Sequence, residues 1–270
     1  MISLTSMTES QLAILRLAIF VLIICALLIA EWRWSFRRYP VSKLKRLIDN
    51  LGLMAISSLF QRIASAGGAF VAAVWAAQNG YGVFNLLMLP KWLEIVATLL
   101  LLDFAIYLQH LVFHKINWLW RIHRVHHSDI GFDCSTAVRF HFIEIIISTV
   151  YKMFLAVLVG APALAVVLFE ILLNGFALFN HSNIHFPSKL DKWLRYVVIT
   201  PDMHRIHHSA RWDETNSNYG FSVPFWDRLC GTYVQNPALG QNNMQIGLPD
   251  QQNAKPVGLI KLLLMPFQSG

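Results

Sequence analysis

Charged residues are scarce in this sequence of 270 residues. Only 14% are charged and 56% are hydrophobic, whereas about 25% of the residues in an average soluble domain are charged. The deficit excludes an ordinary soluble protein and indicates one that lies in a membrane. The net charge of +7 does not indicate nucleic acid, because the basic residues flank apolar segments as the positive-inside rule predicts. We expect no nucleic-acid partner.

Cysteine is also rare, and its spacing shows no pairing. Cys25, Cys134 and Cys230 lie far apart, without a C-x-x-C, which excludes a disulfide framework and a cysteine-ligated iron–sulfur centre. A glycine-rich nucleotide motif and a haem-binding domain are missing as well. Any redox chemistry here must therefore draw electrons from a separate protein.

Apolar runs that are long enough, or nearly so, to cross a bilayer are abundant. They cover Leu12–Ala30, Leu51–Ala77, Leu86–Leu108, Phe142–Val159 and Ala163–Phe179. Only Gly160, Ala161 and Pro162 separate the last two, which predicts a helical hairpin with a tight turn. We expect an all-α integral membrane bundle of four to five spans.

Cations place the loops relative to the membrane. Six follow the first run: Arg33, Arg37, Arg38, Lys43, Lys45 and Arg46. Such clusters mark cytoplasmic loops, and further cations accompany the histidine clusters. We therefore expect a cytoplasmic, histidine-rich helical cap on the bundle. Within the second run, either Arg62 snorkels to the cytoplasmic interface, or the first half lies along the interface and the span starts near Ile63.

Ten of the eleven histidines fall into four tight clusters. Two are H-x-x-x-H and two are H-x-x-H-H, formed by His110 and His114, by His123, His126 and His127, by His181 and His185, and by His204, His207 and His208. Neutral imidazole suits iron, zinc and copper. Ten ligands exceed what one ion binds, and each H-x-x-H-H can give two ligands to one ion and one to a second. The pattern predicts a binuclear site. A zinc hydrolase needs only three protein ligands and one open position, so ten histidines are too many for it. Two iron ions that activate oxygen at a membrane fit the pattern better.

Helical spacing adds two polar residues to this site. Asp103 and Tyr107 share one helix face with His110 and His114. A metal-bound histidine usually donates its second N–H to a carboxylate or carbonyl. Asp103 is therefore a candidate acceptor, and an ion pair with Arg62 is the alternative.

Three further features have two readings each. Arg139, His141 and Glu144 form either a structural polar group at the start of the fourth run or a group that contacts substrate or ligands. Asp227 is either a hydrogen-bond partner of a metal-bound imidazole or a residue that simply helps to fold the cap. The Asn218–Gly220 loop either closes over the site or simply completes the fold of the cap.

Several of these motifs together resemble the fatty acid hydroxylase/sterol desaturase superfamily of integral membrane non-haem di-iron enzymes. The matching text is HLVFH (110–114), HRVHH (123–127), HSNIH (181–185), MHRIHH (203–208), NYGF (218–221) and WDRLCGTY (226–233). The spacing D-x-x-x-Y-x-x-H from Asp103 to His110 is also similar, so the resemblance covers residues 95–233. It implies that the ten clustered histidines hold two iron ions, with zinc as an alternative occupant in purified protein.

This sequence departs from the family pattern at three positions. Phe142 stands where the family often has proline, and Leu108 and Leu111 stand where tryptophan and arginine are common around the first motif. These departures bear on the substrate more than on metal binding.

The resulting prediction is an O2-dependent di-iron oxidation, by hydroxylation or desaturation, of a membrane lipid such as a sterol or fatty acyl lipid. The lipid would come from the bilayer, and electrons from a separate ferredoxin, cytochrome b5 or reductase. The alternative is a membrane metal-binding or transport protein without oxygenase activity. A transporter, however, holds its ligands near mid-membrane on broken helices, whereas these clusters lie at helix ends.

We divide the sequence into three regions. Residues 1–90 form the N-terminal membrane helices with the basic loop, residues 91–233 form the di-metal domain, and residues 234–270 form a polar tail. The tail contains a short apolar piece, Val257–Phe267, which either lies on the membrane or packs on the body of the protein.

Overall fold

A computed structural model describes residues 8–39, 41–65, 67–87, 89–251 and 257–268. The first and third predicted regions therefore include residues outside the described set. In the described ranges the regular structure is helical, apart from an isolated bridge between Ser209 and Ile246. The predicted all-α class is confirmed.

Five stretches are long and apolar enough to cross a membrane. They are α1 (Glu9–Trp34), the combined stretch Lys43–Leu86, α5 (Lys91–Lys115), α7 (Phe142–Val159) and α8 (Ala163–Asn180). Large apolar side chains such as Leu22, Ile29 and Phe154 are exposed on their outer faces. Five apolar helices of spanning length with such outer faces fit the hydrocarbon core of a bilayer, so the chain is a multi-pass membrane protein.

The predicted second span is not one straight helix. Its described helical residues lie in α2 (Lys43–Ser65) and α3 (Gly68–Gln78), and the short α4 (Val83–Leu86) follows it. Gly67, between α2 and α3, has φ +119°, a backbone conformation that residues with a Cβ atom rarely adopt. Arg62 is exposed near the end of α2.

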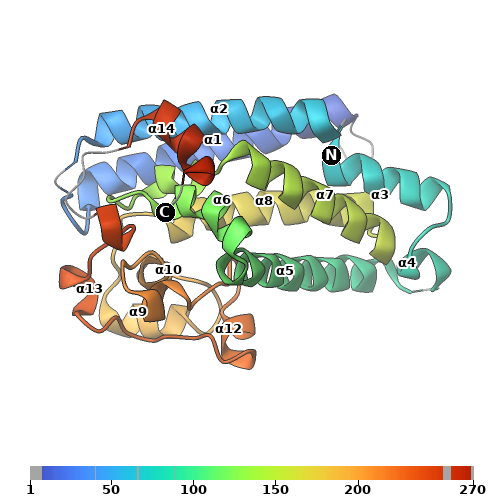
Figure 1. The fold of residues 1–270 in the computed structure, drawn as a ribbon. Coiled ribbons are helices and arrows are strands. Elements are labelled where there is room, and N and C mark those ends of the chain that lie inside the picture. The colour runs from blue at the N-terminus through green and yellow to red at the C-terminus, as the bar shows by residue number, and fades with distance from the viewer. Residues whose placement is uncertain (1–7, 40, 66, 88, 252–256, 269–270) are drawn as a thin grey trace.

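The predicted hairpin joins α7 to α8. Gly160 has φ +70° and ends α7, while Pro162 precedes the first residue of α8. Both residues suit their positions, because glycine tolerates positive φ and proline cannot continue a helix. In the bundle, α1 and α5 pack on α8, whereas α2 and α3 pack on α7 (Figure 1).

Short helices gather at one end of the bundle and form the cap. They are α6 (Asn117–His127), η2 (Cys134–Val138), α9 (Ser188–Leu194), α10 (Pro201–His207), α11 (Trp212–Thr215), α12 (Phe225–Leu229), α13 (Gly240–Asn243) and η3 (Pro249–Gln251). Figure 1 shows α9, α10, α12 and α13 at the end opposite to α3 and α4. All the predicted histidine clusters lie at this end or adjoin it.

The apolar C-terminal piece packs on the body of the protein. It forms α14 (Leu259–Leu264) and η4 (Met265–Phe267). Leu262 and Met265 share a buried cluster with Leu53 of α2 and Val125 of α6. The tail therefore supports the helix that carries three of the clustered histidines.

Candidate metal centre

Nine of the ten predicted histidine ligands come together in two groups. Within each group the ligand atoms lie within 4.8 Å of one another. The first group is His110, His114, His123, His127 and His207, and the second is His126, His181, His204 and His208. All nine have side chains that are almost fully withdrawn from solvent.

Both H-x-x-H-H motifs are shared between the groups. In α6, His123 and His127 belong to the first group and His126 to the second. In the second motif, at the end of α10, the middle histidine, His207, belongs to the first group, whereas His204 and the C-cap residue His208 belong to the second. Residues four apart are offset by about 40° around a helix and residues three apart by about 60° in the opposite sense. The first and last histidines therefore share a face, and the middle one points to the neighbouring group.

The second group converges on one point. His181 donates from Nδ1 to the carbonyl of Ala177 at 2.7 Å, so its Nε2 carries a lone pair. The Nε2 atoms of His126, His204 and His208 each lie 3.1 Å from that nitrogen. One lone pair cannot accept three hydrogen bonds, whereas ligands 2.0–2.1 Å from one ion lie about 3 Å apart. The spacing fits a metal ion better than a hydrogen-bond network.

The first group presents the same conflict between lone pairs. His110 donates from Nδ1 to the carbonyl of Tyr219, and His123 donates from Nδ1 to the Glu144 carboxylate, each at 2.7 Å. Their Nε2 atoms then face each other at 3.2 Å with no proton between them. A bound cation would remove this repulsion.

Several other ring nitrogens in the two groups are buried without a hydrogen-bond partner among the described residues. They are both nitrogens of His114, Nε2 of His127 and His207, and Nδ1 of His126, His204 and His208. Buried polar atoms are normally paired. Burial lowers the pKa of His181 to about 4 and that of His207 to about 3, so both rings are neutral, as metal ligands must be. These nine residues fit two metal ions.

One loop supplies acceptors that orient the rings of the first group. The carbonyl of Ser217 accepts from Nδ1 of His207 at 2.7 Å, in the same way as Tyr219 does for His110. Asp227 in turn accepts from the backbone N–H groups of Tyr219 and Gly220, at 2.8 and 2.9 Å. Asp227 therefore positions the loop and does not reach an imidazole directly.

The other two predicted polar residues also lie one step away from the rings. Asp103 accepts a hydrogen bond from the indole of Trp226 at 2.8 Å, so its partner is neither a histidine nor Arg62. The hydroxyl of Tyr107 lies 3.0 Å from that of Thr232, which donates to Asp227. Both side chains therefore support α12 and the loop that precedes it.

His185 stands apart from both groups in the described part of the chain. Its Nδ1 lies 2.6 Å from a carboxylate oxygen of Asp202, and its ring is exposed and stacks on Phe36. His141 caps α7, where it accepts from the N–H of Ile143 and lies 3.2 Å from the carbonyl of Leu263. Both therefore have structural partners.

Glu144 is the carboxylate that contacts a clustered histidine in the first group, which agrees with the second of the two readings given for it from the sequence. It lies in the first turn of α7, and its other carboxylate oxygen, Oε2, is buried without a partner. The available signal was its place as the only acid in the largely apolar run Phe142–Val159. Spacing could not reveal its partner, because His123 lies on a different helix.

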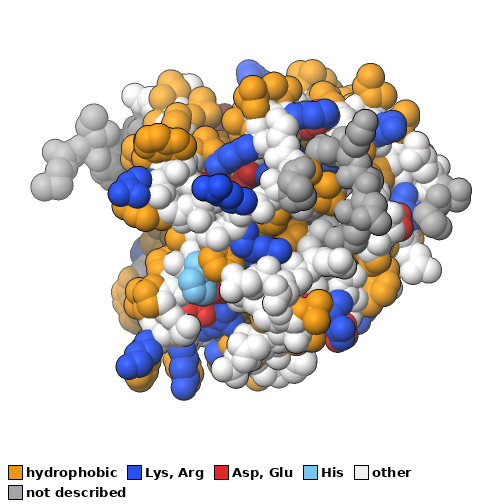
Figure 2. All heavy atoms as spheres, turned by 90° about the vertical axis from the view of Figure 1, so that its left-hand side faces the viewer, with side chains coloured by type: hydrophobic (Ala, Val, Ile, Leu, Met, Phe, Trp, Pro, Cys, Tyr) orange, Lys and Arg blue, Asp and Glu red, His pale blue; other side chains and the backbone are white. Residues whose placement is uncertain are grey.

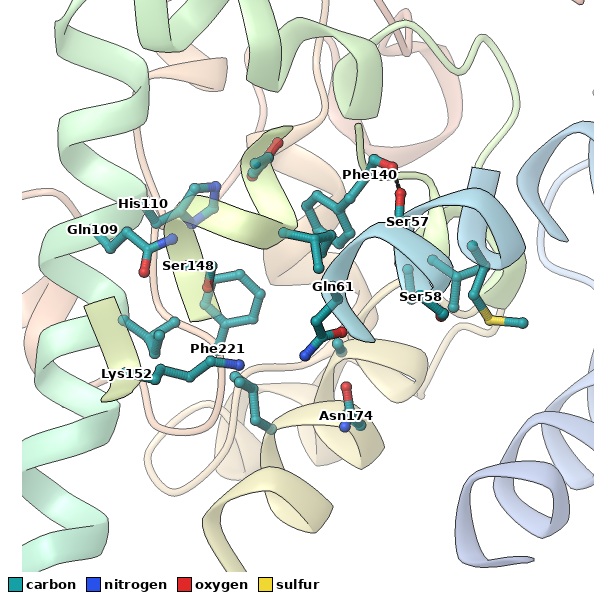
Figure 3. Close-up of a pocket in the computed structure, with 18 of the residues that line it drawn as sticks. Ser57, Ser58, Gln61, Gln109, His110, Phe140, Ser148, Lys152, Asn174 and Phe221 are labelled. Atoms are coloured by element: carbon teal, nitrogen blue, oxygen red, sulfur yellow. Dashed lines mark hydrogen bonds between the residues drawn. The ribbon is translucent and has the colours of Figure 1, made fainter. Parts of the chain in front are cut away.

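A cavity of about 430 Å³ adjoins the first group. His110, His123 and Glu144 line it, together with Phe140 and Phe221 (Figure 3). Its volume lies within the range of about 300–1,000 Å³ that is typical of small-molecule sites. An apolar molecule can therefore reach the edge of the histidine site.

Comparison with known proteins supports this picture. The fatty acid hydroxylase family matches residues 95–232, which is just over half of the chain. Ornithine lipid hydroxylase OlsE of Rhizobium tropici is 33% identical over 66% of this chain and 51% of its own length. Alkylglycerol monooxygenase of Xenopus tropicalis is 28% identical over 80% and 46%, and human cholesterol 25-hydroxylase is 27% identical over 52% and 50%. The chain thus spans about half the length of these relatives. No solved structure matches it.

Proposed function

The chain belongs to the fatty acid hydroxylase family, and on this premise we propose that it hydroxylates a membrane lipid with O2 at two iron ions. One oxygen atom would enter a C–H bond to give an alcohol and the other would leave as water. Two electrons and two protons complete this balance. The relatives named above are hydroxylases or monooxygenases by name, which favours hydroxylation over desaturation.

One observation carries the proposal: two groups of buried imidazoles lie together in a membrane protein, and the first of them lines a cavity of about 430 Å³. All-nitrogen ligands suit iron, and the cavity can receive a lipid from the surrounding bilayer. We assign the nine grouped histidines as ligands. His185 is the remaining predicted ligand, and its contact with Asp202 favours a supporting role instead.

Iron, when bound at this site, supplies the activation of O2 that an unactivated C–H bond requires. The residues of the chain hold and orient the site. Glu144 accepts the Nδ1 proton of His123, which leaves the Nε2 lone pair of His123 free for a metal ion. The carbonyl of Tyr219 accepts the Nδ1 proton of His110 in the same way. Phe140 and Phe221 form an apolar wall that keeps water away from the reacting end of the cavity.

We further propose that residues 91–233 form the catalytic unit and that the cap faces the cytoplasm. The family match over residues 95–232 supports the first statement. The cap end carries exposed cations, including Lys115, Arg121, Lys189, Lys192 and Arg211. Figure 2 shows lysine and arginine side chains predominating over acidic ones on this face. Such a surface agrees with the positive-inside rule and can dock an acidic electron donor, such as a ferredoxin, cytochrome b5 or a reductase.

The test is metal analysis of protein purified without oxygen, followed by lipid oxidation with O2 and a reductant. We expect two irons per chain and an oxidised lipid. His207→Ala should lower the iron content and abolish turnover, because His207 belongs to the first group. The matched control is His185→Ala, which removes a clustered histidine outside both groups and should retain both irons.

One zinc per chain, or full turnover by His207→Ala, would refute the proposal. Firmly bound metal without any O2-dependent lipid product would instead favour the alternative of a metal-binding or transport protein.

A further inference from the structure

The cavity has a polar end far from the histidines. Gln61 of α2, Lys152 of α7 and Asn174 of α8 line this part. Figure 3 shows the three side chains directed toward one another from three helices, with Lys152 extending across the cavity toward Gln61 (Figure 3). Polar side chains inside a membrane bundle are costly and usually serve a function. The mechanism described above uses none of these three.

Lys152 has no direct ion-pair partner in the described part of the chain. The carboxylate of Glu170 acts on it electrostatically but already forms an ion pair with Arg16 of α1. Arg16 also lines the cavity. Arg16 and Glu170 neutralise each other. Glu144, the acidic residue that lines the cavity, lies about two helical turns from Lys152 and accepts from His123, so Lys152 has no carboxylate at ion-pair distance among the described residues. An anionic ligand would stabilise the ammonium of Lys152, whose charge is otherwise costly within a membrane-spanning segment.

The position of Lys152 relative to the histidines follows from one helix. Glu144, Ser148 and Lys152 lie four residues apart on α7 and all line the cavity. They form a stripe along one helix face. At 1.5 Å per residue, Lys152 lies about 12 Å along the axis from Glu144. Apolar residues such as Phe20, Ile106 and Leu173 cover part of the remaining wall.

We infer that the cavity binds a lipid whose anionic group pairs with Lys152 and whose alkyl chain runs along this stripe to His110 and His123. This rests on the proposed function and adds the class of substrate. Gln61 and Asn174 can donate their amide N–H groups to the same anion. The anion would set the register of the chain, so that the oxidised carbon lies at a fixed distance from it, comparable with the separation of about 12 Å between Lys152 and Glu144 along α7. Neutral lipids of equal size would leave the charge on Lys152 unpaired.

The first test measures binding alone. A fluorescent fatty acid bound to the detergent-solubilised protein is displaced by palmitate or by methyl palmitate, which has the same chain without the charge. We expect palmitate to displace it about tenfold more effectively, as a charge-assisted hydrogen bond predicts. Lys152→Met should remove this difference and Lys152→Arg should retain most of it. The matched control is Lys91→Met, which removes an exposed lysine at the end of α5.

Equal displacement by acid and ester, or an unchanged preference in Lys152→Met, would overturn the inference. Iron content and gel filtration show whether Lys152→Met folds. If it does not, the acid–ester comparison on the unaltered protein and on Lys152→Arg still decides.

The second test uses products and separates this inference from the proposed function. With saturated acids of 14, 16 and 18 carbons, the new hydroxyl should stay at a constant number of carbons from the carboxylate. A hydroxyl that stays constant from the methyl end would overturn the inference, although the enzyme would still be a lipid hydroxylase. Acid binding that depends on Lys152 without oxidation of any lipid would support the inference and refute the proposed function.

Discussion

Replacing Glu144 tests the structure at the point where it adds most to the sequence. Glu144 accepts from Nδ1 of His123 at 2.7 Å, and both side chains are buried. A buried hydrogen bond to a charged group contributes about 1.5–3 kcal/mol, roughly twice a neutral one. Glu144→Gln keeps an acceptor oxygen but loses the charge. We therefore expect a loss of about 1–1.5 kcal/mol, or about tenfold in iron affinity at the first group.

Glu144→Ala should have a larger effect, because it removes the acceptor altogether. Loss of such a partner typically costs about 10–100-fold in metal affinity. The assay is iron retention against increasing chelator, without lipid, so that contacts between Glu144 and a substrate do not contribute. Glu94→Gln is the matched control. Glu94 is a buried carboxylate in the first turn of α5, at the end of that helix away from His110 and His114, and it pairs with Lys91.

Retention equal to that of the unaltered protein in both Glu144 variants would refute the assigned role. An equal loss in Glu94→Gln would show that any buried carboxylate has this effect, and the reasoning from the His123 contact would fail.

Two further predictions concern the support of the cap. Arg46→Met should destabilise the protein by about 3–5 kcal/mol, because it leaves the buried Asp129 and Asp133 carboxylates without their shared cation; thermal unfolding in detergent measures this, and an unchanged midpoint would contradict it. Leu262→Ala should cost about 2–5 kcal/mol by opening a void beside Val125 of α6, and the midpoint should fall while purified protein keeps its irons. Exposed Leu264→Ala is the control and should change the midpoint little.

Much of the candidate site could be predicted from the sequence because its ligands are arranged locally. His110 and His114, or His204 and His208, share a helix face through a spacing of four residues, which any α-helix imposes. The apolar runs likewise predicted a helical membrane bundle, because a bilayer demands about twenty apolar residues per span. The family resemblance then followed from the order of the histidine motifs, and the family match confirmed it.

Contacts between distant segments could not be predicted in this way. Asp103 and Asp227 were expected near the imidazoles, yet Trp226 and the backbone of Tyr219 and Gly220 are their partners. Glu144 has the contact that Asp103 was expected to make. Each of these pairs joins separate helices or loops, and spacing along one helix carries no information about its neighbour.

The sequence by itself therefore determined the class of protein, the histidine motifs and the number of ions that they suit. The tertiary structure decided which histidines lie together in one group, that His185 stands apart from both groups, and that Lys152 lines the cavity that reaches His110. The physical reason is that periodicity sets which way a side chain points from its own helix. Only the packing of α2, α5, α7 and α8 sets what it meets there.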